Sequence, residues 1–143
     1  MSKLDFKGKL FVVSGASSGL GRILTEKLVS DGCKVIGIGR NEAKFVDFKA
    51  TLGDKSDMLE TEIFDVSDEI GWKNLAAKLA ARGDALNGLI NCAGVFPPFG
   101  KAVDFTVSDI ESVMKTNFLS AVYAVKNLLP FLEKSGFPTI VNV

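Results

Sequence analysis

A cluster of three glycines near the start of the chain, Gly15, Gly19 and Gly21, constrains the fold more than any other feature of the sequence. Residues 10–13 before it are apolar and include two valines, which is typical of a strand buried on both faces. Residues 20–30 after it have the spacing of an amphipathic helix. The cluster therefore lies in a tight strand-to-helix turn, where the first N–H groups of the helix are available to an anion such as a phosphate.

The spacing gives each glycine a separate purpose. Gly15 can take the tight turn that leaves the strand, Gly19 lets the backbone approach a pyrophosphate, and Gly21 lets the helix lie close to the sheet. The pattern is Gly-x-x-x-Gly-x-Gly, whereas the general dinucleotide fingerprint is Gly-x-Gly-x-x-Gly. We therefore expect a variant of that loop, although an ordinary turn before a helix would also satisfy the glycines alone.

Composition limits the class of protein. The sequence has 143 residues, 47% of them hydrophobic, with 17 basic and 17 acidic side chains, which fits one compact domain. It has no dense run of lysine and arginine, so a nucleic-acid partner is not expected. No apolar stretch approaches the roughly 20 residues of a membrane-spanning helix, so no membrane partner is expected either. The first nine residues alternate in charge without a signal-peptide core, which predicts a cytoplasmic protein.

Cysteine and histidine usage restricts the chemistry. Cys33 and Cys92 are far apart and belong to no Cys-x-x-Cys pair, so we interpret both as small buried hydrophobic residues. The sequence contains no histidine. This excludes Ser-His triads from these residues and removes the commonest ligand of zinc and iron, so no metal site is expected.

Apolar runs and helical patterns alternate along the whole chain. The expected strands cover residues 10–13, 34–39, 58–66, 86–91 and 139–143. The expected helices cover residues 20–30, 42–52, 67–81 and 108–134, with Ser67 as the N-cap of the third. Such alternation implies right-handed crossovers, and hence an α/β fold with a doubly wound parallel sheet of Rossmann type. The sequence stops at the start of the fifth strand, so we expect residues 1–143 to form one domain that is incomplete at its C-terminus.

Four short motifs together resemble the N-terminal part of a short-chain dehydrogenase/reductase. They are the glycine turn of residues 14–21, Asp65-Val66 after the third strand, residues 91–94 (Asn-Cys-Ala-Gly) after the fourth, and Asn117 in the long helix. The resemblance covers nearly the whole chain. Ser14 stands where threonine is common and Cys92 where asparagine is common, and neither change removes a backbone contact.

The resemblance implies a set of residues that bind a nicotinamide dinucleotide. These are Gly15, Ser17, Ser18, Gly19, Leu20, Gly21, Arg40, Asn41, Asp65, Val66, Asn91, Ala93 and Gly94. Asp65 would accept a hydrogen bond from the adenine amino group, with a Val66 backbone contact beside it, and residues 91–94 would line the ribose and nicotinamide side. Purely structural interpretations stay open, because a carboxylate is favoured near a helix N-terminus and an Asn-to-Gly loop needs no ligand.

The residues at the end of the second expected strand indicate which nicotinamide cofactor is favoured. Dinucleotide folds place an acidic residue there for a ribose 2′-hydroxyl, or an arginine for a 2′-phosphate. This sequence has Gly39-Arg40 at that point, with no carboxylate to repel a phosphate. Arg40 can form charge-assisted hydrogen bonds, and Ser17 and Asn41 can add neutral ones. NADP(H) is therefore favoured over NAD(H), while an exposed arginine without a ligand remains the alternative.

Asn117 is a weak helix former in the middle of the long helix. The resemblance implies a catalytic role: it would distort the helix so that a main-chain carbonyl holds a water in a proton relay. Tyr123 and Lys126 are three residues apart, whereas the family's catalytic pair is Tyr-x-x-x-Lys. We interpret them as ordinary helix residues, with the tyrosine partly buried and the lysine solvated.

The family's catalytic Ser, Tyr and Lys follow the fifth strand and would come after Val143. The resemblance implies that the intact protein transfers a hydride between a nicotinamide cofactor and a carbonyl or alcohol substrate. Residues 1–143 alone are expected to be inactive, and residues 139–143 to form an uncovered sheet edge. The alternative is a non-catalytic nucleotide-binding or interaction module with a naturally shortened chain.

The long helix carries more apolar residues than one face of a sheet needs. We expect a homodimer or tetramer through this helix, as the resemblance implies. The alternative is that these side chains only cover the sheet. They are Phe118, Val122, Val125, Leu128, Leu129 and Phe131.

Overall fold

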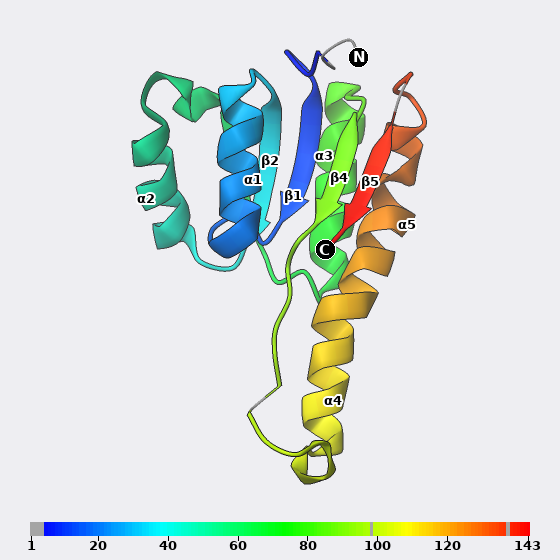
Figure 1. The fold of residues 1–143 in the computed structure, drawn as a ribbon. Coiled ribbons are helices and arrows are strands. Elements are labelled where there is room, and N and C mark those ends of the chain that lie inside the picture. Colours follow the sequence, from blue (N-terminus) through cyan, green and yellow to red (C-terminus); the bar gives the residue numbers. More distant parts are fainter. Residues whose placement is uncertain (1–4, 98, 137) are drawn as a thin grey trace.

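The computed structural model describes residues 5–97, 99–136 and 138–143. Residues 1–4, which form part of the start used above to argue against a signal peptide, lie outside the described residues. Within those ranges the strands form one five-stranded sheet in the order β3-β2-β1-β4-β5, and every neighbouring pair is parallel (Figure 1). The strands are β1 Leu10–Ser14, β2 Lys34–Gly39, β3 Leu59–Ile63, β4 Gly88–Asn91 and β5 Thr139–Asn142.

Helices cover both faces of this sheet. They are α1 Gly19–Ser30, α2 Glu42–Leu52, α3 Glu69–Arg82 and α5 Ser120–Leu132. A further helix, α4 Val107–Met114, buries none of its residues and extends beyond the carboxyl ends of the strands (Figure 1). A π-helical turn, Lys115–Leu119, joins α4 to α5, and 3-10 turns occupy Gly53–Met58 and Ala102–Asp104. Buried residues of α1 and α2 pack on one face of the sheet, and those of α3 and α5 pack on the other (Figure 1). The expected doubly wound α/β fold is confirmed.

The chain reverses its direction of winding beside β1. It proceeds from β1 outward to β2 and β3, then returns to place β4 on the other side of β1 and β5 beyond it. The loops that leave β1 and β4 consequently lead to helices on opposite faces of the sheet. Ligands of open α/β sheets bind at such a switch point.

The third helix begins differently from the expectation. Ser67 is not its N-cap, because both its N–H and its hydroxyl donate to Asp65 Oδ1, over 2.9 and 2.8 Å. Asp68 caps the helix instead, with its side chain accepting from the N–H of Ile70. Because the Ser67 hydroxyl donates to Asp65, two residues upstream, Ser67 does not cap the helix.

Besides shifts of one residue at several ends, larger differences occur at three further places. β3 ends at Ile63 rather than at residue 66, since the N–H of Phe64 makes the last bond of the ladder, to the carbonyl of Gly39, and the chain then turns away. β4 begins at Gly88 rather than at residue 86. The long helix expected over residues 108–134 is divided by the π-helical turn.

Trp72 of α3 links the core to the carboxyl edge of the sheet. Its indole is fully buried and its Nε1–H donates to the carbonyl oxygen of Val66 over 2.9 Å. The ring also contacts Phe64 edge-on, with 5.3 Å between ring centroids. Burial of this side chain therefore holds residues 64–66 in place where they leave β3.

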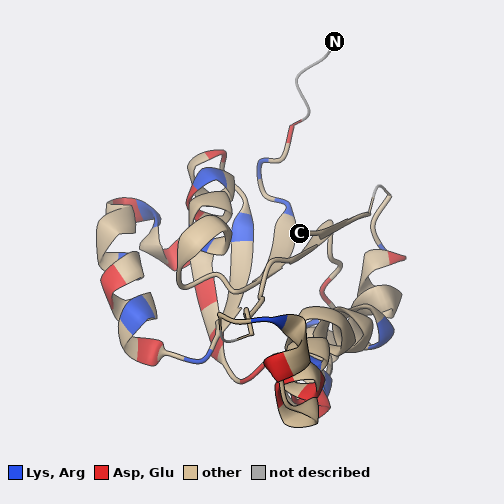
Figure 2. Ribbon diagram, turned by 60° about the horizontal axis from the view of Figure 1, so that its bottom comes forward, with Lys and Arg blue, Asp and Glu red and all other residues tan. Residues whose placement is uncertain are grey.

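The remaining expectations about burial are met in part. Cys33 is buried, as expected, whereas Cys92 is only half-buried; burial raises the pKa of both thiols. β5 is the last strand in the sheet order and all of its residues are exposed, as expected for an uncovered edge. No helix in the described ranges is long and apolar enough to cross a bilayer. Basic and acidic residues are interspersed along the helices (Figure 2).

Candidate functional site

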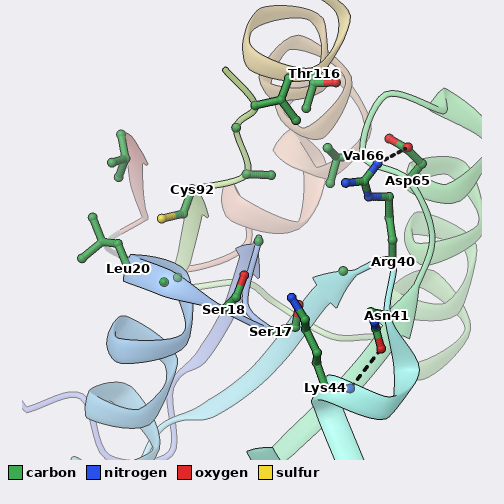
Figure 3. A pocket seen from close by; sticks show the side chains of 18 of the residues that line it. Ser17, Ser18, Leu20, Arg40, Asn41, Lys44, Asp65, Val66, Cys92 and Thr116 are labelled. Carbon is green, nitrogen blue, oxygen red and sulfur yellow. Dashed lines mark hydrogen bonds and ion pairs between the residues drawn. The ribbon is translucent and has the colours of Figure 1, made fainter. Parts of the chain in front are cut away.

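A cavity of about 440 Å³ lies at the carboxyl ends of the strands, where the winding reverses (Figure 3). All the residues expected to bind the dinucleotide line it, except Asn91. Several other residues line the cavity that were not predicted from the sequence, and most of them lie within a few positions of the predicted ones. These are Gly39, Lys44, Phe64, Cys92, Val95, Phe96, Thr116 and Val143.

The glycine turn brings the start of α1 to the floor of this cavity. Gly15 has a φ of +70°, which other residues rarely adopt. A Cβ atom on Gly21 would overlap the carbonyl oxygen of Gly15 and lie 2.8 Å from its carbonyl carbon, so only glycine lets the helix approach the turn this closely. This geometry agrees with the roles expected from the spacing, a tight turn at Gly15 and a close approach of the helix at Gly21.

The N-terminus of α1 is open to an anion. Ser18 is the N-cap residue, but its side chain makes no capping hydrogen bond, and the first turn contains no acidic residue. The first N–H groups of the helix and the positive end of its dipole therefore face the cavity without a competing side-chain oxygen.

Ser14 joins the two loops that flank the cavity. Its side chain is buried and its Oγ accepts from the N–H groups of Cys92 and Ala93, over 3.1 and 3.2 Å. A Cβ on Gly15 would lie 2.9 Å from the Cα of Ala93, so the loops after β1 and β4 are in close contact. A hydroxyl at position 14 thus places residues 92–94 opposite the glycine turn.

Arg40 and Asp65 meet at one edge of the cavity. Arg40 Nη1 lies 3.5 Å from Asp65 Oδ2, and Ser67 donates two hydrogen bonds to the other oxygen, Oδ1. Burial works against ionisation of Asp65, but the bonds from Ser67 and the charge of Arg40 outweigh it and lower the pKa of Asp65. The end of β2 carries no carboxylate in the sequence, but the fold brings Asp65 to Arg40 from the loop after β3.

Asn91 is not among the residues that line the cavity. It is 7% exposed, and its Nδ2 donates to Asn142 Oδ1 over 2.8 Å. Its carbonyl oxygen accepts from the N–H of Val143. The residue therefore connects the ends of β4 and β5 behind the loop of residues 92–94.

Asn117 lies in the π-helical turn, which agrees with the expected distortion of the long helix. Its side chain makes two hydrogen bonds to the backbone of Val95. The Val95 N–H donates to Asn117 Oδ1 over 2.7 Å, and Asn117 Nδ2 donates to the Val95 carbonyl oxygen over 2.8 Å. Val95 lines the cavity, as does Thr116 next to Asn117. The asparagine therefore sets the position of one wall of the cavity.

Tyr123 and Lys126 are ordinary helix residues, as expected. Tyr123 is half-buried and packs against the core. Lys126 is exposed and its Nζ lies 3.0 Å from a carboxylate oxygen of Glu69. Neither residue lines the cavity.

The chain belongs to the short-chain dehydrogenase family, since the family model described as short chain dehydrogenase matches residues 9–143. It is 28% identical to the NADP-dependent 3-hydroxy acid dehydrogenase YdfG of Escherichia coli, over 94% of this chain and 53% of that protein. It is 31% identical to the dehydrogenase/reductase SDR family member 6 of Xenopus laevis, over 100% of this chain and 54% of that protein.

Solved structures agree with this assignment. The crystal structure of serine dehydrogenase from Escherichia coli matches with a TM-score of 0.80 and 28% identity, over 92% of this chain and 59% of that one. The chain thus spans a little over half the length of the relatives it matches. The resemblance read from the four motifs is confirmed.

Proposed function

We propose that the protein is an NADP(H)-dependent oxidoreductase that transfers a hydride between the cofactor and a carbonyl or alcohol substrate. The observation that carries the proposal is the cavity at the switch point, with the uncapped start of α1 at its floor and Arg40 at its edge. Its volume of about 440 Å³ is within the range of small-molecule sites. The relative YdfG of Escherichia coli is named as an NADP-dependent dehydrogenase, which supports the same choice of cofactor.

The residues present fit a dinucleotide. The N-terminal N–H groups of α1, with Ser18 and Leu20 around them, would hold the pyrophosphate. Ser17 and Asn41 would add neutral hydrogen bonds to the 2′-phosphate beside Arg40. Asp65 would accept from the adenine amino group, and Val66 would offer its backbone. When bound, NADP(H) supplies or accepts the hydride.

The other side of the cavity would serve the reacting end of the cofactor. Ala93 and Gly94 would line the ribose and nicotinamide, and Asn91 would support them from behind through Asn142. Asn117 would position Val95 and, as the family resemblance implies, take part in the proton relay.

Arg40 is expected to set the preference for NADP(H). A hydrogen bond to a charged group contributes about 1.5–3 kcal/mol, which corresponds to roughly a ten- to hundredfold preference. Titration of the full-length protein should show that preference, and Arg40→Ala should reduce it toward equal affinity. Lys34→Ala, which removes a cation from the opposite end of β2, should leave it unchanged.

The same preparation tests the reaction. Incubation with NADPH and a panel of ketones and aldehydes should oxidise the cofactor. Equal affinity for both cofactors, or no effect of Arg40→Ala, would contradict the NADP(H) assignment. Binding without turnover of any carbonyl or alcohol would favour the alternative, a nucleotide-binding or interaction module.

The outer face of α5 supports the proposal of a homo-oligomer. Leu128 and Phe131 are buried and cover the sheet, as the alternative interpretation held. Phe118, Val122 and Leu129 are 55%, 42% and 41% exposed. Ile110 and Met114 of α4 are exposed as well, at positions that continue the same four-residue spacing as Phe118 and Val122.

Light scattering of the full-length protein at micromolar concentration should show a dimer or tetramer. The double variant Phe118→Asp/Val122→Asp should shift it toward the monomer, because two charges would have to be buried in the interface. Val46→Asp, at an exposed apolar position on α2, should leave the assembly unchanged. A monomeric wild-type protein would count decisively against this proposal.

A further inference from the structure

Three ionised side chains line the described part of the cavity: Arg40, Lys44 and Asp65. Arg40 and Asp65 form an ion pair, with 3.5 Å between Nη1 and Oδ2. The Lys44 ammonium has no hydrogen-bond or ion-pair partner among the described residues. The positive charge of this end of the cavity therefore resides on Lys44, because the other two charges offset each other.

The start of α2 determines where Lys44 lies. Asn41 is the N-cap, and its Oδ1 accepts from the backbone N–H of Lys44 over 3.1 Å. This bond places Lys44 in the first turn of α2, which begins directly after Arg40 leaves β2. In Figure 3 the Lys44 side chain extends in the direction of Ser17, whereas Arg40 extends toward Asp65.

Asp65 is held in a position where it engages Arg40. Both the N–H and the hydroxyl of Ser67 bind its Oδ1, which leaves Oδ2 directed to the guanidinium. A phosphate monoester carries a charge of about −1.5 to −2 near pH 7. Beside Arg40 such a group meets a cation that a carboxylate already partly neutralises.

We propose that Lys44 is a second specificity-determining residue, which binds the 2′-phosphate of NADP(H) together with Arg40, and that Asp65 weakens the contribution of Arg40. The inference rests on the proposed function, since it places the adenosine end of the cofactor in this cavity. Lys44 acts as a mobile point charge on a flexible stem, and Arg40 as a planar donor whose orientation is shared with Asp65. Lys44 contacts only the additional phosphate, so its loss should not affect binding of a ligand that lacks this group.

Two nucleotides isolate the contribution of the phosphate: adenosine 2′,5′-bisphosphate carries it and 5′-AMP does not. Calorimetric titration of the full-length protein gives the ratio of the two affinities. Lys44→Gln should lower this ratio about tenfold, the loss of one charge-assisted contact, and leave the affinity for 5′-AMP unchanged. Lys44→Arg should restore the ratio. Lys49→Gln, which removes the same charge from the same helix outside the cavity, should have no effect.

Asp65→Asn tests the second half of the inference. It removes the charge beside Arg40 and should raise the ratio, and any change in the adenine contact cancels because both nucleotides carry adenine. An unchanged ratio in this variant would overturn the role given to Asp65.

The outcomes separate the inference from the function on which it rests. If Arg40→Ala lowers the ratio and Lys44→Gln does not, the inference is wrong and the proposed function stands. If Lys44→Gln weakens both nucleotides equally, the lysine acts through the fold and the inference is again wrong. If the wild-type protein binds neither nucleotide, the proposed function itself fails.

Discussion

Replacing Gly21 by alanine should destabilise the protein and weaken cofactor binding roughly ten- to a hundredfold. The added Cβ would overlap the carbonyl group of Gly15, which is backbone and has no rotamer to change. The turn cannot retreat easily, because the N–H of Ala16 is bonded to the carbonyl of Ile38 in β2. Helix α1 must therefore move outward, and its first N–H groups with it. Overpacking of this kind typically costs about 1–3 kcal/mol in the free energy of unfolding.

Urea unfolding and NADPH titration of the Gly21→Ala variant measure the two effects separately. Gly136→Ala is the matched control, because a Cβ at that position meets nothing within 4 Å. The control should bind and unfold like the wild-type protein. A Gly21→Ala variant that keeps wild-type affinity for NADPH would show that close packing of α1 on the turn is not needed at this site.

Trp72→Ala should lower the free energy of unfolding by about 3–5 kcal/mol, the usual cost of removing a large aromatic side chain from a core. The indole is fully buried, packs edge-on against Phe64 and donates to the carbonyl oxygen of Val66. Phe64 and Val66 both line the cavity. The variant should therefore also bind the cofactor more weakly, even at temperatures where it remains folded.

Unfolding followed by circular dichroism measures this effect. Trp72→Phe keeps most of the apolar contact and loses the hydrogen bond, so it should cost less, about 1–3 kcal/mol. Ile70→Ala changes an exposed residue of the same helix and should stay within about 0.5 kcal/mol of the wild type. A loss below 1 kcal/mol in Trp72→Ala would contradict the structural role given to the indole.

Elements bounded by local signals were predicted closely from the sequence. The strand 34–39 and the helix 42–52 were both expected with the bounds that the structure shows. Gly32, which adopts a positive φ, ends the preceding helix, and Asn41 caps the next one with its own side chain. These interactions join residues only a few positions apart, so the sequence contains both partners of each within one short window.

The glycine turn was likewise predicted from local signals. Its position between a buried strand and a helix predicted the switch-point site, since the required turn geometry and the required close approach can both be read from glycine spacing. The motifs after β3 and β4 then reach the same cavity, because the carboxyl ends of parallel strands share one edge of the sheet.

Tertiary structure decided which side chains meet there. Asp65 lies 25 residues from Arg40 in the chain, and no local pattern predicts that the two residues pair. Asn91 donates a hydrogen bond to Asn142, which is 51 residues away, and no local pattern predicts this pair. The sequence by itself determined the order of the elements and the edge of the sheet at which a phosphate ligand would bind, because these follow from local backbone preferences and periodicity. Only the folded chain determined which charges are paired and which remain available, since that depends on distances between loops that are remote in sequence.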